Sequence, residues 1–374
     1  MNTAVTTAEP ARASGGATPR DGRYHGFDLV RIAAALAVVL THSFSTTGHS
    51  ADKPLLGIGE RELGPGSLGV AVFFVISGFL VTESWRRAPG ARRFLVRRVV
   101  RIWPALVTML LLTTFVLGPI VTDLSLGAYL TDPQSWRYAW KNGILVTGVT
   151  FELPGVFTTN PGPPVNSSLW TLPYEIWCYL GLVLLGMIGA LRSRTVVLGL
   201  FLVALGLHVV ATPGDDPWIS AAGWGLSARK GAELATMFLG GAVIALWRSA
   251  VDRRWLLAGG AVLMALAFPV GQWGLFVVGL PALVVGLGTT SGPISRAVGR
   301  WGDPSYGVYI LSYPLQQVLV ATGVVTTSWA MFALAAPLAL VLGYLSWHLV
   351  ESPALRRGRR RPGATPGATA GGSP

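Results

Sequence analysis

The sequence predicts an all-α polytopic membrane protein with about ten transmembrane helices and both termini in the cytoplasm. Composition is the first reason, because the 374 residues are 51% hydrophobic and only 12% charged, whereas a soluble domain carries about 25% charged residues. The second reason is the recurrence of apolar stretches of about 20 residues, the length that crosses a bilayer as a helix. The third is the uneven distribution of Lys and Arg between alternate loops.

The apolar stretches define ten expected helices, and only a tight turn around Gly271 separates the seventh from the eighth. A further short interfacial helix is expected around 134–148, within a long loop, 122–167, that is rich in Pro and aromatic residues. We expect this loop to fold over the outer mouth of a cavity. The ten helices are expected at 27–45, 67–85, 99–121, 168–190, 195–211, 231–248, 255–270, 272–289, 303–322 and 328–350.

Positive charge provides an independent test of this helix order. If both termini are cytoplasmic, the cytoplasmic segments contain 22 Lys and Arg residues and the outer segments contain six. Cytoplasmic loops of membrane proteins are enriched in these residues, so the bias favours this topology and a location in the plasma membrane. The net charge of +12 is then explained by membrane orientation, and nucleic acid is not expected as a partner.

One membrane domain and two polar ends make up the expected organisation. Residues 1–24 lack the apolar core of a secretory signal peptide, and we expect a disordered cytoplasmic lead there. Residues 25–355 form the transmembrane domain, and 356–374 form a disordered basic cytoplasmic tail. The single cysteine, Cys178, lies in an apolar stretch, so a disulfide within the chain is excluded and no metal site is expected.

Two ionisable side chains, Arg31 and His42, lie in the first expected helix. A spacing of eleven residues returns to within roughly 20° of the same helix face and rises about 16 Å. Ionisable side chains at such depth usually face a bundle interior or a wet cavity. Arg31 is also explained by snorkelling to lipid headgroups, and His42 by a position at the outer helix end. We expect the pair to be functional, with His42 exchanging a proton near neutral pH.

An arginine cluster precedes and opens the third expected helix. Arg98 and Arg101 are one helical turn apart and point the same way, and Arg97 belongs to the same cluster. Guanidinium groups at this spacing suit phosphate oxygens, so we expect a phosphate-bearing soluble cofactor here. The alternative is a juxtamembrane cluster that fixes topology and binds anionic lipid, and it explains some of these arginines.

A carboxylate, Glu175, lies inside the fourth expected helix. Trp170 and Tyr174 are close to it in sequence and are expected to form an aromatic-walled pocket around it. Glu175 is expected to orient His42 or to hold a sugar hydroxyl. The alternative is a structural hydrogen bond between helices.

In their order along the chain, these segments resemble the acyltransferase-3 family of membrane O-acyltransferases. The resemblance runs from residue 24 to residue 355. The matching segments are Arg31 with His42, Phe73–Leu80, Arg97–Pro104 and Ser168–Glu175, with weaker matches at Ser305–Tyr309 and Val350–Pro353.

The resemblance implies that an acyl-CoA, most often acetyl-CoA, enters as co-substrate from the cytoplasm and that a carbohydrate or related hydroxyl accepts the acyl group. In one departure, this chain has Ser312 where members often carry His in the ninth helix. The expected site residues are His42 and Glu175 for catalysis, Arg31, Arg97, Arg98 and Arg101 for binding CoA, and Ser77, Trp170 and Tyr174 for binding the acceptor.

Other functions are weighed against this one. A proton-coupled secondary transporter or flippase would use Arg31, His42 and Glu175 as a proton relay, but the sequence shows no inverted repeat of the kind that transporters usually have. A purely structural subunit does not explain the ionisable residues in apolar helices. The acceptor stays open between a polysaccharide, a lipid-linked sugar and a small hydroxylated metabolite, as do the acyl length, the oligomeric state and whether His42 acts as a general base or carries the acyl group itself.

Overall fold

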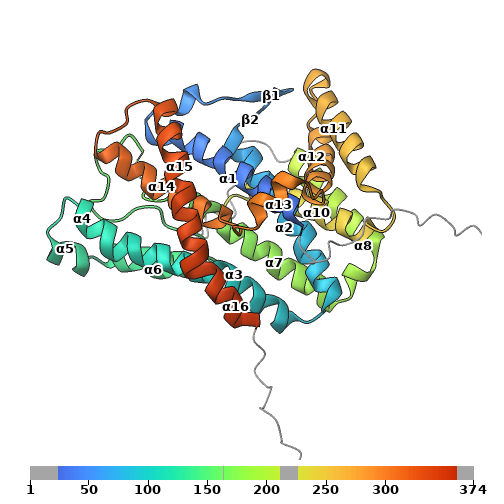
Figure 1. Cartoon of the computed structure of the whole chain (residues 1–374), viewed down its shortest axis with the longest axis horizontal. Helices are drawn as coiled ribbons and strands as arrows, with labels where there is room; N and C mark the ends of the chain where they lie inside the picture. The colour runs from blue at the N-terminus through green and yellow to red at the C-terminus, as the bar shows by residue number, and fades with distance from the viewer. Residues whose placement is uncertain (1–23, 163, 211–225, 360–374) are drawn as a thin grey trace, which may run out of the picture.

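A computed structural model describes residues 24–162, 164–210 and 226–359 as a bundle of helices with one small β-hairpin (Figure 1). Residues 1–23 of the expected lead and residues 360–374 of the expected tail lie outside the described residues. The helices are α1 (His25–Thr46), α2 (Pro65–Arg87), α3 (Ala91–Leu112), α4 (Gly118–Val121), α5 (Leu126–Thr131), α6 (Pro133–Ile144), α7 (Leu172–Met187), α8 (Arg194–Val210), α10 (Ala228–Trp247), α11 (Arg253–Val270), α12 (Trp273–Gly288), α13 (Pro293–Gly299), α14 (Ser305–Ala321), α15 (Ser328–Ser346) and α16 (Ser352–Arg359). Short 3₁₀ turns lie at Ser50–Asp52, Ser167–Thr171 and Ala190–Arg192, and π-helical turns lie at Thr113–Leu117 and Trp347–Glu351.

Each of the ten expected helices has a counterpart in the structure, and the expected short helix in the long loop is α6. Within the described residues, seven helical segments are long and apolar enough to cross a membrane, or eight if α12 and α13, bent by 80°, form one span. α8 and α14 have 17 residues each and so extend about 26 Å, somewhat less than the roughly 30 Å of a bilayer core. The mostly helical, polytopic fold is confirmed, and the count of ten spans stays a prediction.

A β-hairpin is the element that the all-α prediction missed. β1 (Leu56–Ile58) pairs antiparallel with β2 (Arg61–Leu63), and Gly59 in the turn has φ +61°, a conformation that favours glycine. A Cβ on Gly59 would lie 2.5 Å from the carbonyl oxygen of Gly271, so the hairpin tip contacts the turn between α11 and α12. Strands of three residues are too short to show the alternating pattern by which strands are predicted.

Two expected boundaries also differ from the structure. α3 begins at Ala91 and not near residue 99, so the arginine cluster lies on the helix itself. Arginine favours the helix and keeps its charged end in water while its stem covers apolar surface. α16 continues to Arg359, so residues 356–359 of the expected tail are helical.

Glycine residues allow α2 and α10 to pack closely. A Cβ on Gly78 would lie 1.9 Å from the carbonyl oxygen of Phe238, and one on Gly241 would lie 2.1 Å from that of Val75. Small residues at such positions are common where membrane helices cross. α2 also packs against α1, which in turn contacts α14 and α15. These contacts form the frame around the candidate site.

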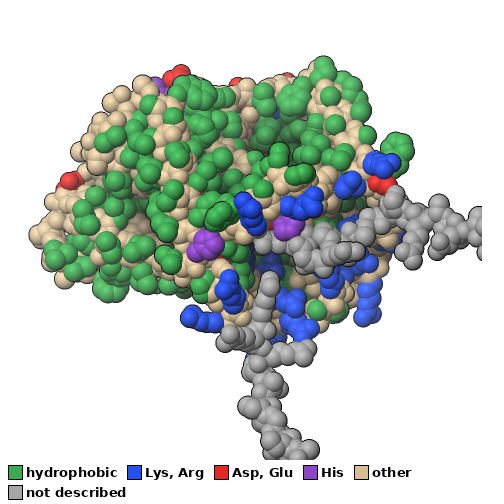
Figure 2. Space-filling view, viewed as in Figure 1, with side chains coloured by type: hydrophobic (Ala, Val, Ile, Leu, Met, Phe, Trp, Pro, Cys, Tyr) green, Lys and Arg blue, Asp and Glu red, His purple; other side chains and the backbone are tan. Residues whose placement is uncertain are grey.

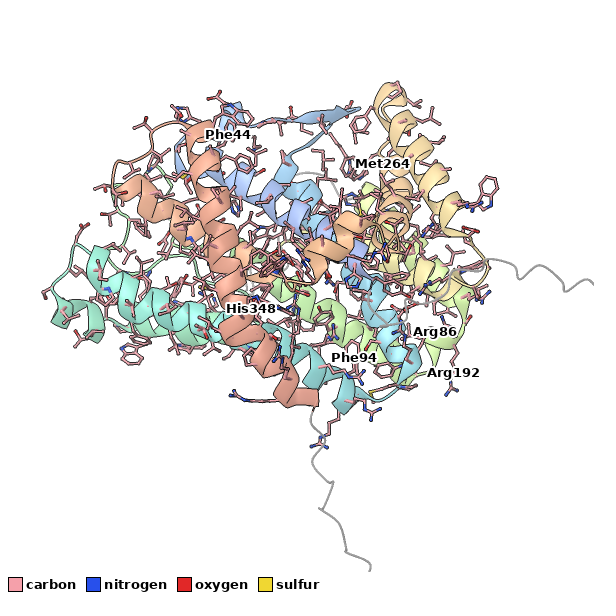
Figure 3. The ribbon with its side chains drawn as sticks, viewed as in Figure 1. Phe44, Arg86, Phe94, Arg192, Met264 and His348 are labelled. Carbon is pink, nitrogen blue, oxygen red and sulfur yellow. The ribbon has the colours of Figure 1, made fainter. Side chains whose placement is uncertain are left out.

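Positively charged side chains gather along the lower and right-hand edge of the molecule, beside a broad hydrophobic surface (Figure 2). Arg86 and Arg192 both lie on this side, whereas Phe44 of α1 lies near the top (Figure 3). The gathering of positive charge on one side of the molecule agrees with the uneven distribution of Lys and Arg between alternate loops. Which side faces the cytoplasm stays a prediction.

Candidate active site

A cavity of about 120 Å³, here named the polar cavity, lies where α1, α2, α3, α7 and the start of α14 meet. It brings together five of the expected site residues, because Arg31, Ser77, Arg98, Arg101 and Glu175 all line it. The other polar residues in its lining are Thr171, Tyr179, Ser305, Tyr306 and Tyr309.

Two arginines of the polar cavity are held by buried carboxylates. Arg101 donates from Nη2 to Oδ2 of Asp303 and from Nη1 to Oε2 of Glu351, both at 2.7 Å. Arg31 Nη1 donates to the same Asp303 oxygen at 3.1 Å. Since Asp303 and Glu351 are almost completely buried, these pairs fix both guanidinium groups in place.

Asp303 lies in the loop that leads into α14. Its Oδ1 accepts hydrogen bonds from the backbone N–H of Ser305 at 3.2 Å and from the Ser305 hydroxyl at 2.5 Å. Burial favours the protonated acid, but the charges of Arg101 and Arg31 and the Ser305 hydrogen bonds outweigh it and hold the pKa of Asp303 below its ordinary value. Asp303 is therefore an anion at neutral pH.

Arg98 has a buried donor without a hydrogen-bond partner among the described residues. Its guanidinium lies over the rings of Phe94 and Tyr179, at 5.6 and 5.8 Å from the ring centroids. Its Nε is buried and has no hydrogen-bond partner among the described residues. Leaving a buried donor unpaired is costly, so an oxygen of a bound anion would be favoured at this position.

Glu175 faces the arginines from α7. It accepts a hydrogen bond from the Tyr179 hydroxyl, and the Ser77 hydroxyl donates to Tyr179 at 3.2 Å. Glu175 is close enough to Arg98 and Arg101 to interact with both electrostatically. The expectation that Glu175 orients His42 is not supported by its hydrogen bond, which is made with Tyr179.

His42 lies farther along α1 than Arg31 and is not among the residues that line the polar cavity. Its ring packs edge-on against Tyr313 of α14, with the centroids 4.8 Å apart, and its Nδ1 is buried without a partner in the described chain. Tyr309, one turn before Tyr313, lines the polar cavity, so α14 connects the cavity with the imidazole. Ser312 is buried on the same helix.

Besides His42, three expected site residues do not reach the polar cavity. Arg97 is exposed and contacts the Ser84 hydroxyl at 3.4 Å. Tyr174 lines a different, apolar cavity, and Trp170 packs against its ring with the centroids 5.9 Å apart. Neighbouring residues of a helix point about 100° apart, which places Tyr174 and Glu175 in separate cavities. The structure therefore does not bring Trp170 and Tyr174 together with Glu175 as the walls of one pocket.

Asp303, Glu351 and Tyr179 are site residues that the sequence analysis missed. Asp303 and Glu351 each lie at the edge of an apolar helix in a chain with only 17 acidic residues. A buried carboxylate needs a cationic partner, and this is the signal by which the two could have been found. Glu351 also ends a π-helical turn, Trp347–Glu351, and such distortions are frequent at functional sites.

Comparison with known proteins identifies the family. A family model described as an acyltransferase domain matches residues 24–348, a range that contains the whole lining of the polar cavity. The chain belongs to the acyltransferase-3 family. No solved structure matches it.

Two curated relatives of this acyltransferase cover almost its whole length. The O-acetyl transferase of Shigella phage Sf6 is 28% identical over an alignment 345 positions long that covers 88% of this chain and 96% of the phage protein. Nodulation protein 10 of Rhizobium leguminosarum bv. viciae is 30% identical over an alignment 364 positions long that covers 90% of this chain and 94% of the relative. The acyltransferase is thus an enzyme that transfers acyl groups to oxygen, and its helices indicate a multi-pass membrane protein.

Proposed function

We propose that this acyltransferase moves an acyl group, in the simplest case acetyl, from cytoplasmic acyl-CoA to a hydroxyl group of a carbohydrate or related acceptor. The observation that carries the proposal is the convergence of Arg31, Arg98 and Arg101 with Glu175 in one cavity. Guanidinium groups bind phosphate oxygens strongly, and a carboxylate beside them can accept a hydrogen bond from a hydroxyl. The phage relative named O-acetyl transferase supports acetyl as the acyl group.

Arg98 is proposed to be the main contact for a phosphate of CoA. Arg31 and Arg101 contribute positive potential while they stay paired with Asp303. Arg97, on the exposed side of α3, contacts the donor outside the cavity. The polar cavity of about 120 Å³ is smaller than the roughly 300–1,000 Å³ of a site for a drug-sized ligand, so it holds only the part of the donor that contacts Arg98, and most of the coenzyme lies outside.

His42 supplies the proton transfer in this proposal. It takes the proton from the acceptor hydroxyl, whose oxygen attacks the carbonyl carbon of the thioester, and it returns the proton to the sulfur as the carbon–sulfur bond breaks. Alternatively His42 attacks first, CoA leaves as the thiol, and the acceptor oxygen then takes the acyl group from the imidazole. A labelled acyl group that stays on the denatured protein in the absence of acceptor distinguishes the second route from the first.

The last part of the proposal is the orientation of the protein in the membrane. The arginine-rich ends of α2 and α3 face the cytoplasm, where acyl-CoA is made, and both termini lie on that side of the plasma membrane. The acceptor then approaches from the outer side, past the long segment between α6 and α7. The two substrates therefore reach the site from opposite ends.

Radiolabelled acetyl-CoA given to membranes that contain the protein tests the function. We expect label in extracted glycans, lipids or metabolites with the wild-type chain and a loss of about 10²–10⁴-fold with His42→Ala, the range for a missing general base. His49→Ala is the control, because His49 is exposed at the end of α1. Full transfer by a folded His42→Ala variant would contradict the assignment, and substrate flux without CoA release would indicate a transporter.

A further inference from the structure

A second cavity, here named the apolar cavity, has no part in the proposed reaction. It measures about 720 Å³ and lies between α7, α8 and α10. Leu184 and Val203 line it and are 60% and 61% exposed, so the cavity is open at its side. Water has too few polar partners in such a space to be held there, whereas a hydrocarbon chain suits it.

A cluster of basic side chains lies at one end of α8. His208 is 2% exposed, and its Nε2 lies 3.1 Å from Nη1 of Arg61 and 2.8 Å from Nε1 of Trp273, both of which are donors. Nε2 is therefore the acceptor and Nδ1 carries the hydrogen, yet Nδ1 is buried with no partner in the part of the chain that the structure describes. Lys230 lies near enough to interact with His208 electrostatically, and Glu233 balances part of its charge at 3.0 Å.

The basic cluster and the apolar cavity share one end of the bundle. Val197 lines the cavity, and His208 follows it by eleven residues, which returns to within roughly 20° of the same face of α8. Leu207, directly before His208, lines the cavity too.

Ser227 at the start of α10 also belongs to the lining of the apolar cavity, and its backbone N–H donates to the Tyr174 hydroxyl at 2.7 Å. Tyr174 precedes Glu175, so this end adjoins the polar cavity across α7.

We infer that the apolar cavity binds the hydrocarbon chain of a phosphate-bearing membrane lipid, that Arg61, His208 and Lys230 bind its phosphate, and that this lipid carries the acceptor sugar. The inference rests on the proposed function for the role of the lipid as acceptor. Two cations and an unpaired N–H complement a phosphate group, and the apolar lining complements the chain. The sugar attached to the phosphate then lies at the outer end of α7, the helix that carries Glu175.

Photolabelling tests the binding directly and needs no acyl transfer. The full-length protein in phosphatidylcholine nanodiscs is given a polyprenyl phosphate that carries a diazirine on its chain, and labelled peptides are mapped by mass spectrometry. We expect labels on α7, α8 and α10. Gly181→Leu fills the cavity, since a Cβ at Gly181 meets no atom within 4 Å, and should lower labelling about tenfold, the effect of displacing roughly two methylene groups.

Gly259→Leu is the matched control, because Gly259 is exposed on α11 and its Cβ also meets no atom within 4 Å. Both variants replace glycine by a residue that favours the helix, and equal melting temperatures would show that both fold. Unchanged labelling in Gly181→Leu would overturn the inference. Equal labelling by a diazirine-bearing phosphatidic acid would also overturn it, because an ordinary bilayer lipid would then occupy the cavity.

The phosphate site has its own test. Arg61→Gln combined with Lys230→Gln should lower labelling by the polyprenyl phosphate about tenfold, the effect of losing a charge-assisted hydrogen bond, and leave labelling by the uncharged polyprenol as it was. Arg137→Gln on the exposed side of α6 is the control. Equal labelling of the wild type by the two probes would contradict recognition of the phosphate. Because no readout here depends on CoA, failure of the proposed function would leave these labelling results unaffected.

Discussion

Single residues of the polar cavity differ in how far their roles could be predicted. The sequence relates Arg98 to Arg101 and Arg31 to His42 by helical spacing, and the family resemblance assigns the three arginines to the binding of CoA. It does not show that Asp303 occupies the space between Arg31 and Arg101. Asp303 lies 202 residues from Arg101 and 272 residues from Arg31 along the chain. No local sequence pattern indicates a contact over such a distance.

Asp303→Asn should destabilise the protein. The change leaves Arg31 without its carboxylate and Arg101 with Glu351 alone, and breaking a buried ion pair costs about 3–5 kcal/mol. Thermal unfolding in detergent measures the loss. Asp52→Asn, at an exposed position, should change stability by about 0.5 kcal/mol or less. Equal melting temperatures of wild type and Asp303→Asn would show that the pairs contribute no stability.

The same variant gives a pH dependence. Because the pKa of Asp303 lies below its ordinary value, its stabilisation is fully present above the ordinary aspartate pKa of about 4 and is lost as the pH falls through the lower folded-state pKa. The stability difference between wild type and Asp303→Asn should stay constant from about pH 8 to about pH 5 and narrow only below about pH 4. A difference that already narrows near neutral pH would contradict the ion pairs.

Helices were predicted more completely than the segments between them. The long loop was expected to cover a cavity, and the structure ties it to α14 through buried amides. Asn160 Nδ2 donates to Oε1 of Gln317 at 2.9 Å, Gln317 Nε2 donates to the carbonyl oxygen of Gly162 at 2.6 Å, and Asn166 Nδ2 donates to that of Ile310 at 2.8 Å. Amide pairs between distant segments have no periodicity, so the sequence could not show which helix the loop would join.

Gln317→Leu should release this loop. It removes both the acceptor for Asn160 and the donor to Gly162, and each buried group left unpaired costs about 1–3 kcal/mol. Hydrogen exchange of residues 145–162 should become faster, while exchange in α2 stays as it is. Gln272→Leu is the control, because Gln272 is exposed and makes no side-chain cap bond. Unchanged exchange in the loop would mean that other contacts hold it.

The whole molecule follows the hydrophobic and charge pattern of the chain. Apolar stretches located all ten helices, whereas the short hairpin and the bend of 80° between α12 and α13 depend on turns and packing that composition does not show. Orientation rests on the bias of 22 against six positive residues between alternate segments. This orientation in the membrane can be tested directly.

Single cysteines report which side of the membrane a residue faces. Cys178 is the only cysteine, so Cys178→Ala provides a background without thiols. We expect an impermeant maleimide to label Asp52→Cys in intact cells and Thr195→Cys only after permeabilisation, since both residues are exposed and lie on opposite predicted sides. The reverse pattern would invert the topology and place the polar cavity's arginines on the outer side.

Donor recognition in the polar cavity is tested most directly by comparing acetyl-CoA with acetyl-pantetheine, which lacks phosphate groups, in wild type and Arg98→Gln. Removing a charge-assisted hydrogen bond costs about 1.5–3 kcal/mol, so we expect the KM for acetyl-CoA to rise about 10- to 100-fold while the KM for acetyl-pantetheine stays unchanged. Arg93→Gln, at an exposed position on the same helix, should leave both values unchanged. An equal effect of Arg98→Gln on the two donors, or no effect on either, would contradict the binding of the donor phosphates by this cavity.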